Sequence, residues 1–181
     1  MNIVAICSTL SDFEISCYNT IQKFRNSDNS INLIILKDKK SNVKRFSKTD
    51  EFYNKLGISN IYAVENFNYS KVTQENVNLI NLIIEKIKPS LVIIPFISTS
   101  DKIKKVLAKS SLLACRKVSS ILMYETTKNK KFVPNVFCAI DKKLKRKNNS
   151  LSSIYAKKMG IYLPSEAFES HRMVLLQNDL F

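Results

Sequence analysis

The chain has 181 residues, 45% of them hydrophobic, which is typical of a folded domain and excludes an intrinsically disordered protein. No apolar run reaches the roughly 20 residues that a membrane-spanning helix requires. The formal net charge of +14 has two interpretations: a lysine-rich solvated surface, or a surface that binds nucleic acid or another anionic partner. The basic clusters at 37–45, 128–131 and 142–147 contain no interleaved aromatic residues, so the first interpretation is the simpler one.

Cysteine, histidine and glycine usage excludes several classes of site. The four cysteines are widely spaced and lack a C-x-x-C pair, so we expect reduced, buried thiols at Cys7, Cys17, Cys115 and Cys138. His171 is the single histidine, which excludes a two-histidine metal site within one chain. Neither Gly57 nor Gly160 follows a predicted strand, which excludes dinucleotide-binding and Walker loops. No positive segment precedes the first apolar run, so we expect a strand there, no signal peptide and a cytoplasmic location.

Residues 3–21 predict a strand, a short turn and the start of a helix. The continuous apolar run at 3–6 is typical of a strand that is covered on both faces. Ser11 and Glu14 form an S-x-x-E capping box, which predicts a helix over 12–25. The loop after such a strand lies at the carboxyl edge of an open α/β sheet, where ligands usually bind.

Strands and helices alternate along the rest of the chain. We predict further strands at 31–36, 60–64, 91–96, 121–125, 136–140 and 172–176, with a turn at 165–169. We predict further helices at 41–56, 73–87, 102–117 and 141–159. The helix over 102–117 is expected to bury Ile103, Val106, Leu107, Leu113 and Ala114. This order indicates a single α/β domain over residues 1–181 with a Rossmann-like, largely parallel, doubly wound sheet.

Five segments carry motifs that occur together in one enzyme family. Residues 9–21, TLSDFEISCYNTI, match the pattern H-P-D-D-x-E-L-G-C-G-G-T-I, and residues 88–95, KPSLVIIP, match the strand before an H-x-D-H motif. Residues 122–125, 132–137 and 165–172 match Y-E, F-x-P-N-V-F and A-E-A-F-x-x-x-R. Together they resemble the PIG-L/LmbE-like family of zinc-dependent sugar N-deacetylases, a likeness that covers most of the chain.

The resemblance implies a metal site whose residues are mostly replaced here. In that family the first-motif histidine, the second aspartate and the last histidine of H-x-D-H hold zinc, and the first aspartate is the general base. Thr9 stands at the first histidine, Ser11 at the general base, and Asp12 retains the aspartate ligand. Asp101 and Lys104 stand at the two histidines of the second motif. One aspartate does not hold a catalytic zinc, so we expect no cofactor.

The retained aspartate needs a partner if it is buried. We hypothesise that the ammonium of Lys104, or of Lys105 if the register slips by one residue, takes the place of the metal and pairs with Asp12. Asp12 has an alternative interpretation as an acid favoured near a helix start, and Asp101 is interpreted first as a residue that begins a helix.

Other residues have weaker claims to a site. Ser8, Glu14 and Glu166 are expected at the pocket, with Glu14 also a capping residue and Glu166 also able to hold the C-terminal part of the chain. Cys17 is interpreted as a packing residue, and His171 as a structural or surface residue.

The leading functional prediction is a non-catalytic homologue of the N-acetylglucosaminyl deacetylases. It would bind a sugar, phosphorylated sugar or nucleotide-sugar, or form a homo-oligomer or a complex with an active homologue. One alternative is an active amide hydrolase of glycan or sugar-conjugate metabolism with an unconventional metal site. A second alternative is a basic module that binds nucleic acid or another polyanion.

Overall fold

The computed structural model describes residues 1–25, 29–36, 57–125, 131–139 and 165–172. The helices predicted at 41–56 and 141–159 lie outside these residues, as do Gly160 and most of the three basic clusters. Within the described part of the chain, no helix has the length and apolarity needed to cross a membrane.

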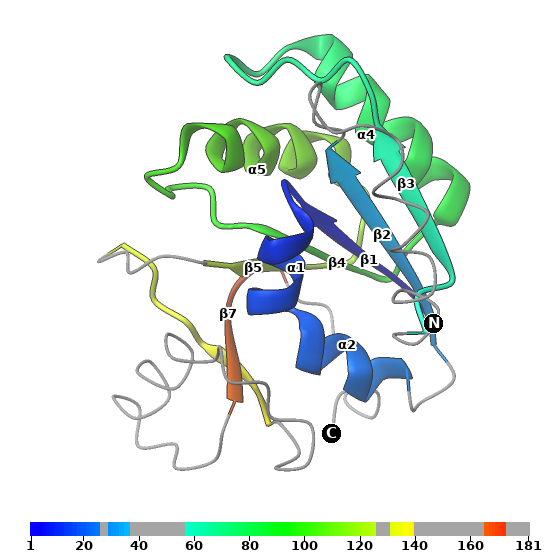
Figure 1. Cartoon of the computed structure of the whole chain (residues 1–181), viewed down its shortest axis with the longest axis vertical. Helices are drawn as coiled ribbons and strands as arrows, with labels where there is room; N and C mark the ends of the chain where they lie inside the picture. The colour runs from blue at the N-terminus through cyan, green and yellow to red at the C-terminus, as the bar shows by residue number, and fades with distance from the viewer. Residues whose placement is uncertain (26–28, 37–56, 126–130, 140–164, 173–181) are drawn as a thin grey trace.

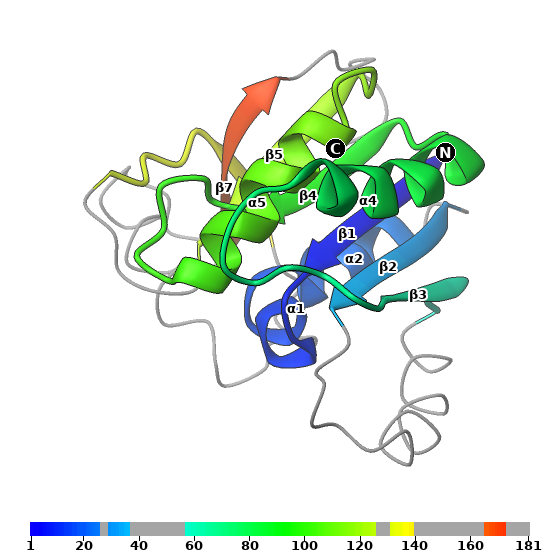
Figure 2. The same cartoon turned by 90° about the horizontal axis from the view of Figure 1, so that it is seen from above.

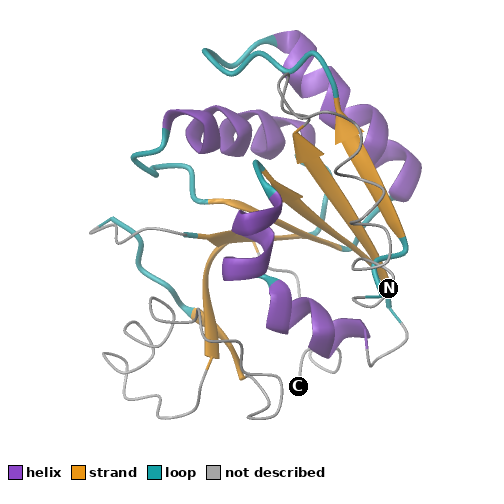
Figure 3. Cartoon of the chain, viewed as in Figure 1, coloured by secondary structure: helices purple, strands orange, loops and turns teal. Residues whose placement is uncertain are grey.

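The described strands form a seven-stranded sheet with the order β3-β2-β1-β4-β5-β7-β6. Figure 3 shows the strands in orange and the helices in purple. The bounds are β1 (Asn2–Cys7), β2 (Ser30–Leu36), β3 (Asn60–Val64), β4 (Leu91–Pro95), β5 (Ser120–Tyr124), β6 (Val136–Ala139) and β7 (Ser165–Arg172). The first five strands pair in parallel, and β7 pairs antiparallel with both β5 and β6. The predicted α/β class with a largely parallel sheet is therefore confirmed.

Helices cover both faces of the sheet (Figures 1 and 2). They are α1 (Leu10–Ser16), α2 (Tyr18–Arg25), α4 (Gln74–Ile87) and α5 (Lys102–Ala114). Alternate residues of β1 point to opposite layers: Val4 and Ile6 join the core under α4 and α5, whereas Ala5 and Cys7 join the core under α1 and α2. Since both faces of β1 are covered, its apolar run is continuous.

The helix predicted over 12–25 is instead two short helices that meet at Cys17. The predicted capping box at Ser11 is wrong, because Ser11 lies inside α1 and Thr9 is the N-cap. The Thr9 Oγ1 accepts a hydrogen bond from the Asp12 backbone N–H at 3.2 Å. The chain turns into the helix directly after β1, so the hydroxyl two residues earlier reaches the exposed backbone donors first.

The burial expected along α5 is partly wrong. Ile103 is 43% exposed and Leu113 is 55% exposed, although Val106, Leu107 and Ala114 are buried as predicted. Ser110 and Ser111, which are fully buried, take the inward positions instead. Small side chains such as serine allow a helix to pack closely on a sheet. The buried face of α5 is therefore centred on these serines, and Leu113 lies on the exposed face.

The turn predicted at 165–169 is wrong, because these residues begin strand β7. Glu166 and Phe168 are both fully buried, opposite Cys138 and Val136 of β6. A charged residue at a core position of the strand hides the apolar pattern that would have predicted it.

The Glu166 carboxylate ties β7 to the start of α2. Its Oε1 accepts hydrogen bonds from the Asn19 backbone N–H at 3.0 Å and from Asn19 Nδ2 at 2.9 Å. Its Oε2 accepts from the Thr20 backbone N–H at 2.8 Å. The two backbone N–H groups are orphan donors of the first turn of α2, where a negative charge is also favoured by the helix dipole. Burial nevertheless raises the pKa of Glu166, against the opposing effect of the donated hydrogen bonds.

We predict that the stability of the wild-type protein relative to Glu166→Gln falls as pH rises above the ordinary glutamate pKa of 4.5. Because the folded-state pKa is raised, the folded protein holds this proton more tightly than the unfolded chain does. Its contribution is full below the unfolded pKa and is lost as pH rises through the folded pKa. Urea unfolding of both proteins between pH 4 and pH 8 measures this difference, and the matched variant cancels the effect of all other groups. A relative stability that increases with pH would contradict the raised pKa.

Candidate functional site

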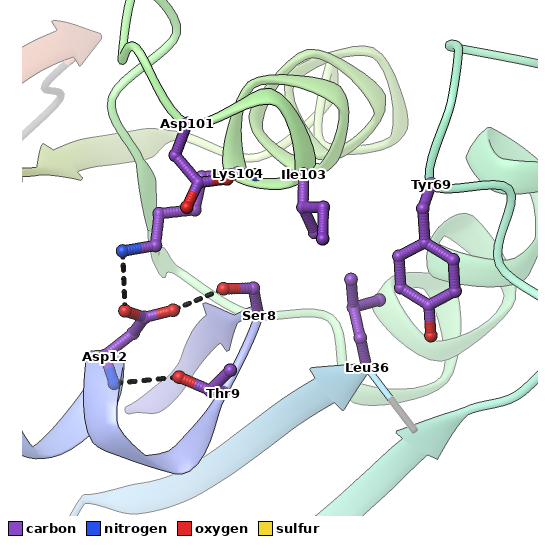
Figure 4. Close-up of a pocket in the computed structure, with 8 residues that line it drawn as sticks. All are labelled: Ser8, Thr9, Asp12, Leu36, Tyr69, Asp101, Ile103 and Lys104. Carbon is purple, nitrogen blue, oxygen red and sulfur yellow. Dashed lines mark hydrogen bonds and ion pairs between the residues drawn. The ribbon is translucent and has the colours of Figure 1, made fainter. Parts of the chain in front are cut away.

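A cavity of about 360 Å³ opens at the carboxyl edge of the sheet (Figure 4). The loop after β1, the start of α1, the end of β2, the loop after β3 and the start of α5 contribute its walls. The lining residues are Ser8, Thr9, Asp12, Leu36, Tyr69, Asp101, Ile103 and Lys104. Strand β1 lies between β2 and β4, whose connecting helices cover opposite faces of the sheet. Such a reversal of strand order is where open α/β sheets bind their ligands.

An ion pair dominates the polar side of the cavity. The Lys104 Nζ lies 2.7 Å from Asp12 Oδ1, and the two side chains are only 12% and 7% exposed. The Ser8 hydroxyl donates a hydrogen bond to the other carboxylate oxygen, Asp12 Oδ2. The pair predicted between Asp12 and Lys104 is therefore present, and both oxygens of the carboxylate have partners.

Helix caps bring the two charged groups together. Thr9 caps α1 and holds the backbone N–H of Asp12. Asp101 caps α5, with its Oδ1 accepting from the Lys104 backbone N–H at 3.0 Å. The interpretation of Asp101 as a residue that begins a helix is confirmed. Each cap thus lies three residues before the charged residue whose backbone it binds, which places both side chains in first helical turns that face the cavity.

The remaining predicted residues lie elsewhere. Glu14 is half-buried on α1 and Glu166 is fully buried beneath α2, and neither lines this cavity. Lys105 is exposed on α5, so the register that places Lys104 on Asp12 is the one observed. His171 is exposed on β7. Cys17 is a buried free thiol that packs with the core under α1 and α2, and burial raises its pKa well above the ordinary value.

Sequence reasoning missed the apolar side of the cavity, which Leu36, Tyr69 and Ile103 form. Leu36 ends β2 at the same sheet edge as Ser8, so strand order could have indicated it. Tyr69 lies in a polar loop without periodicity, and no local signal marks it. Ile103 was assigned to the core from its helical spacing.

The donor set of the cavity does not fit a catalytic zinc ion. Among the residues that the structure describes, no three or more histidine, cysteine, aspartate or glutamate side chains are grouped so that they could hold a metal. Asp12 offers one carboxylate, and a lysine ammonium already lies against it. Threonine and serine hydroxyls are poor zinc ligands, and the ammonium carries the same sign of charge as the metal.

Similar proteins were found among solved structures alone. No protein-family model matches the chain. No curated protein matches it either.

Several solved structures are similar over nearly the whole chain. An N,N'-diacetylchitobiose deacetylase from Pyrococcus horikoshii is 15% identical with a TM-score of 0.68, over 99% of this chain and 88% of that one. The zinc-inhibited form of teicoplanin deacetylase Orf2 is 10% identical with a TM-score of 0.67, over 94% and 97%. GalB, the 4-carboxy-2-hydroxymuconate hydratase of Pseudomonas putida, is 9% identical with a TM-score of 0.70, over 98% of both chains. The fold is therefore that of the PIG-L/LmbE-type deacetylases.

We predict that Lys104→Met lowers the free energy of unfolding by about 2–4 kcal/mol, because it leaves a largely buried carboxylate without its counter-charge. Lys105→Met is the matched control: this lysine is the next residue on α5 and is exposed, so the expected change is within about 0.5 kcal/mol. Urea unfolding at neutral pH measures both. The double variant Asp12→Asn/Lys104→Met should recover part of the loss, and equal effects of the two lysine variants would show that the ion pair contributes nothing.

Proposed function

We propose that this chain is a non-catalytic homologue of the PIG-L/LmbE N-acetylglucosaminyl deacetylases that binds a sugar-type ligand in the cavity. The ion pair between Asp12 and Lys104 is the observation that carries the proposal. The deacetylase fold and the motifs at 9–21 and 165–172 support the family. The occupant of the cavity then depends on the side chains that replace the family's metal ligands.

The replaced residues argue against water activation. A catalytic zinc lowers the pKa of a bound water and polarises the carbonyl that is attacked. That chemistry requires three protein ligands and one open coordination position. Here Thr9 and Lys104 stand at two of the three ligand positions of the resembling family, and a serine stands at the general base. An ammonium beside Asp12 supplies a fixed positive charge and hydrogen-bond donors, which suit a hydroxylated or anionic ligand.

The alternatives make different predictions. An active amide hydrolase would need bound metal and would release acetate from an N-acetyl sugar. A complex with an active homologue would place the catalytic residues on another chain, and a basic module would show salt-dependent binding to nucleic acid. The exposed Lys102 and Lys105 at the start of α5 favour an anionic ligand or partner at the same edge of the sheet.

We predict that the protein purified without chelators carries less than about a tenth of an equivalent of zinc, measured by elemental mass spectrometry before and after soaking in zinc. The variant Thr9→His/Lys104→His should gain close to one equivalent, because two imidazoles then join the Asp12 carboxylate. The control Thr9→His/Lys105→His also introduces two histidines, but the second one lies at an exposed position of α5. It should therefore gain no zinc. Near-stoichiometric zinc in the wild-type protein would overturn the proposal in favour of the hydrolase.

We predict that N,N'-diacetylchitobiose binds in the cavity and is recovered intact. A two-dimensional NMR titration should shift the backbone amides of residues 8–12 and 101–104, while an acetate assay on the same samples stays at the level of a buffer blank. Lys104→Met should weaken binding about tenfold or more, because the ammonium donates hydrogen bonds to sugar oxygens. No amide shift at millimolar sugar would refute a sugar ligand of this type, and acetate release above the blank would refute the non-catalytic assignment.

A further inference from the structure

Tyr69 forms the wall of the cavity that faces the ion pair. Figure 4 shows its ring across the cavity from Asp12 and Lys104, with Leu36 and Ile103 between them. The residue belongs to the loop at 65–73 that connects β3 to α4. One side of the cavity is therefore ionic, and the opposite side is aromatic and aliphatic.

A buried asparagine holds this loop in place. Asn76, on the first turn of α4, is completely buried. Its Oδ1 accepts from the Asn68 backbone N–H at 2.8 Å, and its Nδ2 donates to the Asn68 carbonyl at 2.9 Å and to the Lys71 carbonyl at 3.1 Å. These three bonds flank Tyr69 in the chain on both sides, so the backbone that carries the ring is fixed.

Neighbouring side chains restrict the ring further. Phe67 is 2% exposed and packs edge-to-face on Tyr69, with 5.7 Å between the ring centroids and 66° between the planes. The Asn68 Oδ1 accepts from the Ser70 backbone N–H at 2.9 Å, which tightens the same turn. An aromatic ring that is ordered before binding loses little entropy when a ligand packs on it.

We propose that Tyr69 determines the ligand specificity of the cavity by packing against a ring face of the ligand, and that Asn76 is the residue that positions it. This inference rests on the proposed function, because it takes the cavity to be a binding site. The ligand is a ring-shaped molecule with one apolar face for Tyr69, Leu36 and Ile103. Its polar edge reaches the Asp12–Lys104 pair on the opposite wall.

NMR titration with N,N'-diacetylchitobiose of the wild-type protein, Tyr69→Ala and Tyr69→Phe tests the contact. Tyr69→Ala should weaken binding about tenfold or more, and Tyr69→Phe should stay within about threefold, since it keeps the ring face. If the wild-type protein binds and Tyr69→Ala binds equally well, the inference is wrong and the proposed function stands. If the wild-type protein does not bind, both fail for this ligand class.

A double-mutant cycle tests the positioning role. Asn76→Ala should weaken sugar binding in the wild-type background and have no further effect in the Tyr69→Ala background, because Asn76 acts through Tyr69. A purely structural role would give the same change in both backgrounds. Asn78→Ala is the matched control, since Asn78 is exposed on the same helix and its Oδ1 accepts a hydrogen bond from Gln74 Nε2 within that helix.

Hydrogen exchange follows the loop without any ligand. In Asn76→Ala the backbone amide of Asn68, which donates to Asn76 Oδ1, should exchange at least about tenfold faster than in the wild-type protein, while amides of β1 keep their rates. If Asn76→Ala does not fold, Asn76→Leu replaces it, because leucine has a similar size and can neither accept the bond from Asn68 nor donate the other two. Unchanged exchange in the variant that folds would overturn the positioning role.

Discussion

The carboxylate of Asp12 requires a counter-charge and hydrogen-bond partners, because its side chain is almost entirely removed from solvent. Leaving a buried carboxylate unpaired costs a large fraction of the stability of a domain of this size, so its partners constrain the local structure. The ammonium of Lys104 and the hydroxyl of Ser8 satisfy one carboxylate oxygen each. Together they join the loop after β1 to the start of α5, two segments more than ninety residues apart in the chain.

The strand order of the sheet brings these two segments to the same edge without any contribution from the ion pair. Strand β1 pairs with β2 on one side and with β4 on the other, so the loops that follow β1 and β4 end at the same edge. Each loop enters a helix through a capping side chain, Thr9 in one case and Asp101 in the other. Because a capping residue binds the backbone three residues later, each cap fixes the position of a charged residue one turn into its helix. The geometry of the ion pair thus follows from strand order and helix capping.

Apolar patterning predicted the parallel half of the fold well, because β1, β4 and β5 are short apolar runs and the run in β2 is interrupted at Asn32 alone. The ion pair between Asp12 and Lys104 was predictable from the family resemblance. That resemblance places Asp12 at the retained aspartate ligand of the metal site and Lys104 at a lost histidine ligand of the same site. The S-x-x-E pattern at Ser11 was misleading, since Thr9 meets the helix donors first. Strand β7 was mistaken for a turn because its buried Glu166 is satisfied by backbone donors of α2, a contact that spans 147 residues. The place of Tyr69 in the cavity could not be predicted from the sequence, because the hydrogen bonds that hold its loop come from Asn76, an asparagine within helix α4.

The presence of two charged side chains in its wall favours a binding role for the cavity. Replacement of a buried ion pair by apolar residues of similar size is often neutral or stabilising. Stability alone therefore gives no reason to keep Asp12 and Lys104 when leucine or methionine would fill the same space. The pair lies in the wall of a cavity that a ligand can reach, opposite an aromatic ring held in place by its own network. Two charged groups that recognise the polar edge of a ligand would account for this arrangement, since an apolar pair of similar size would keep the fold but lose that recognition.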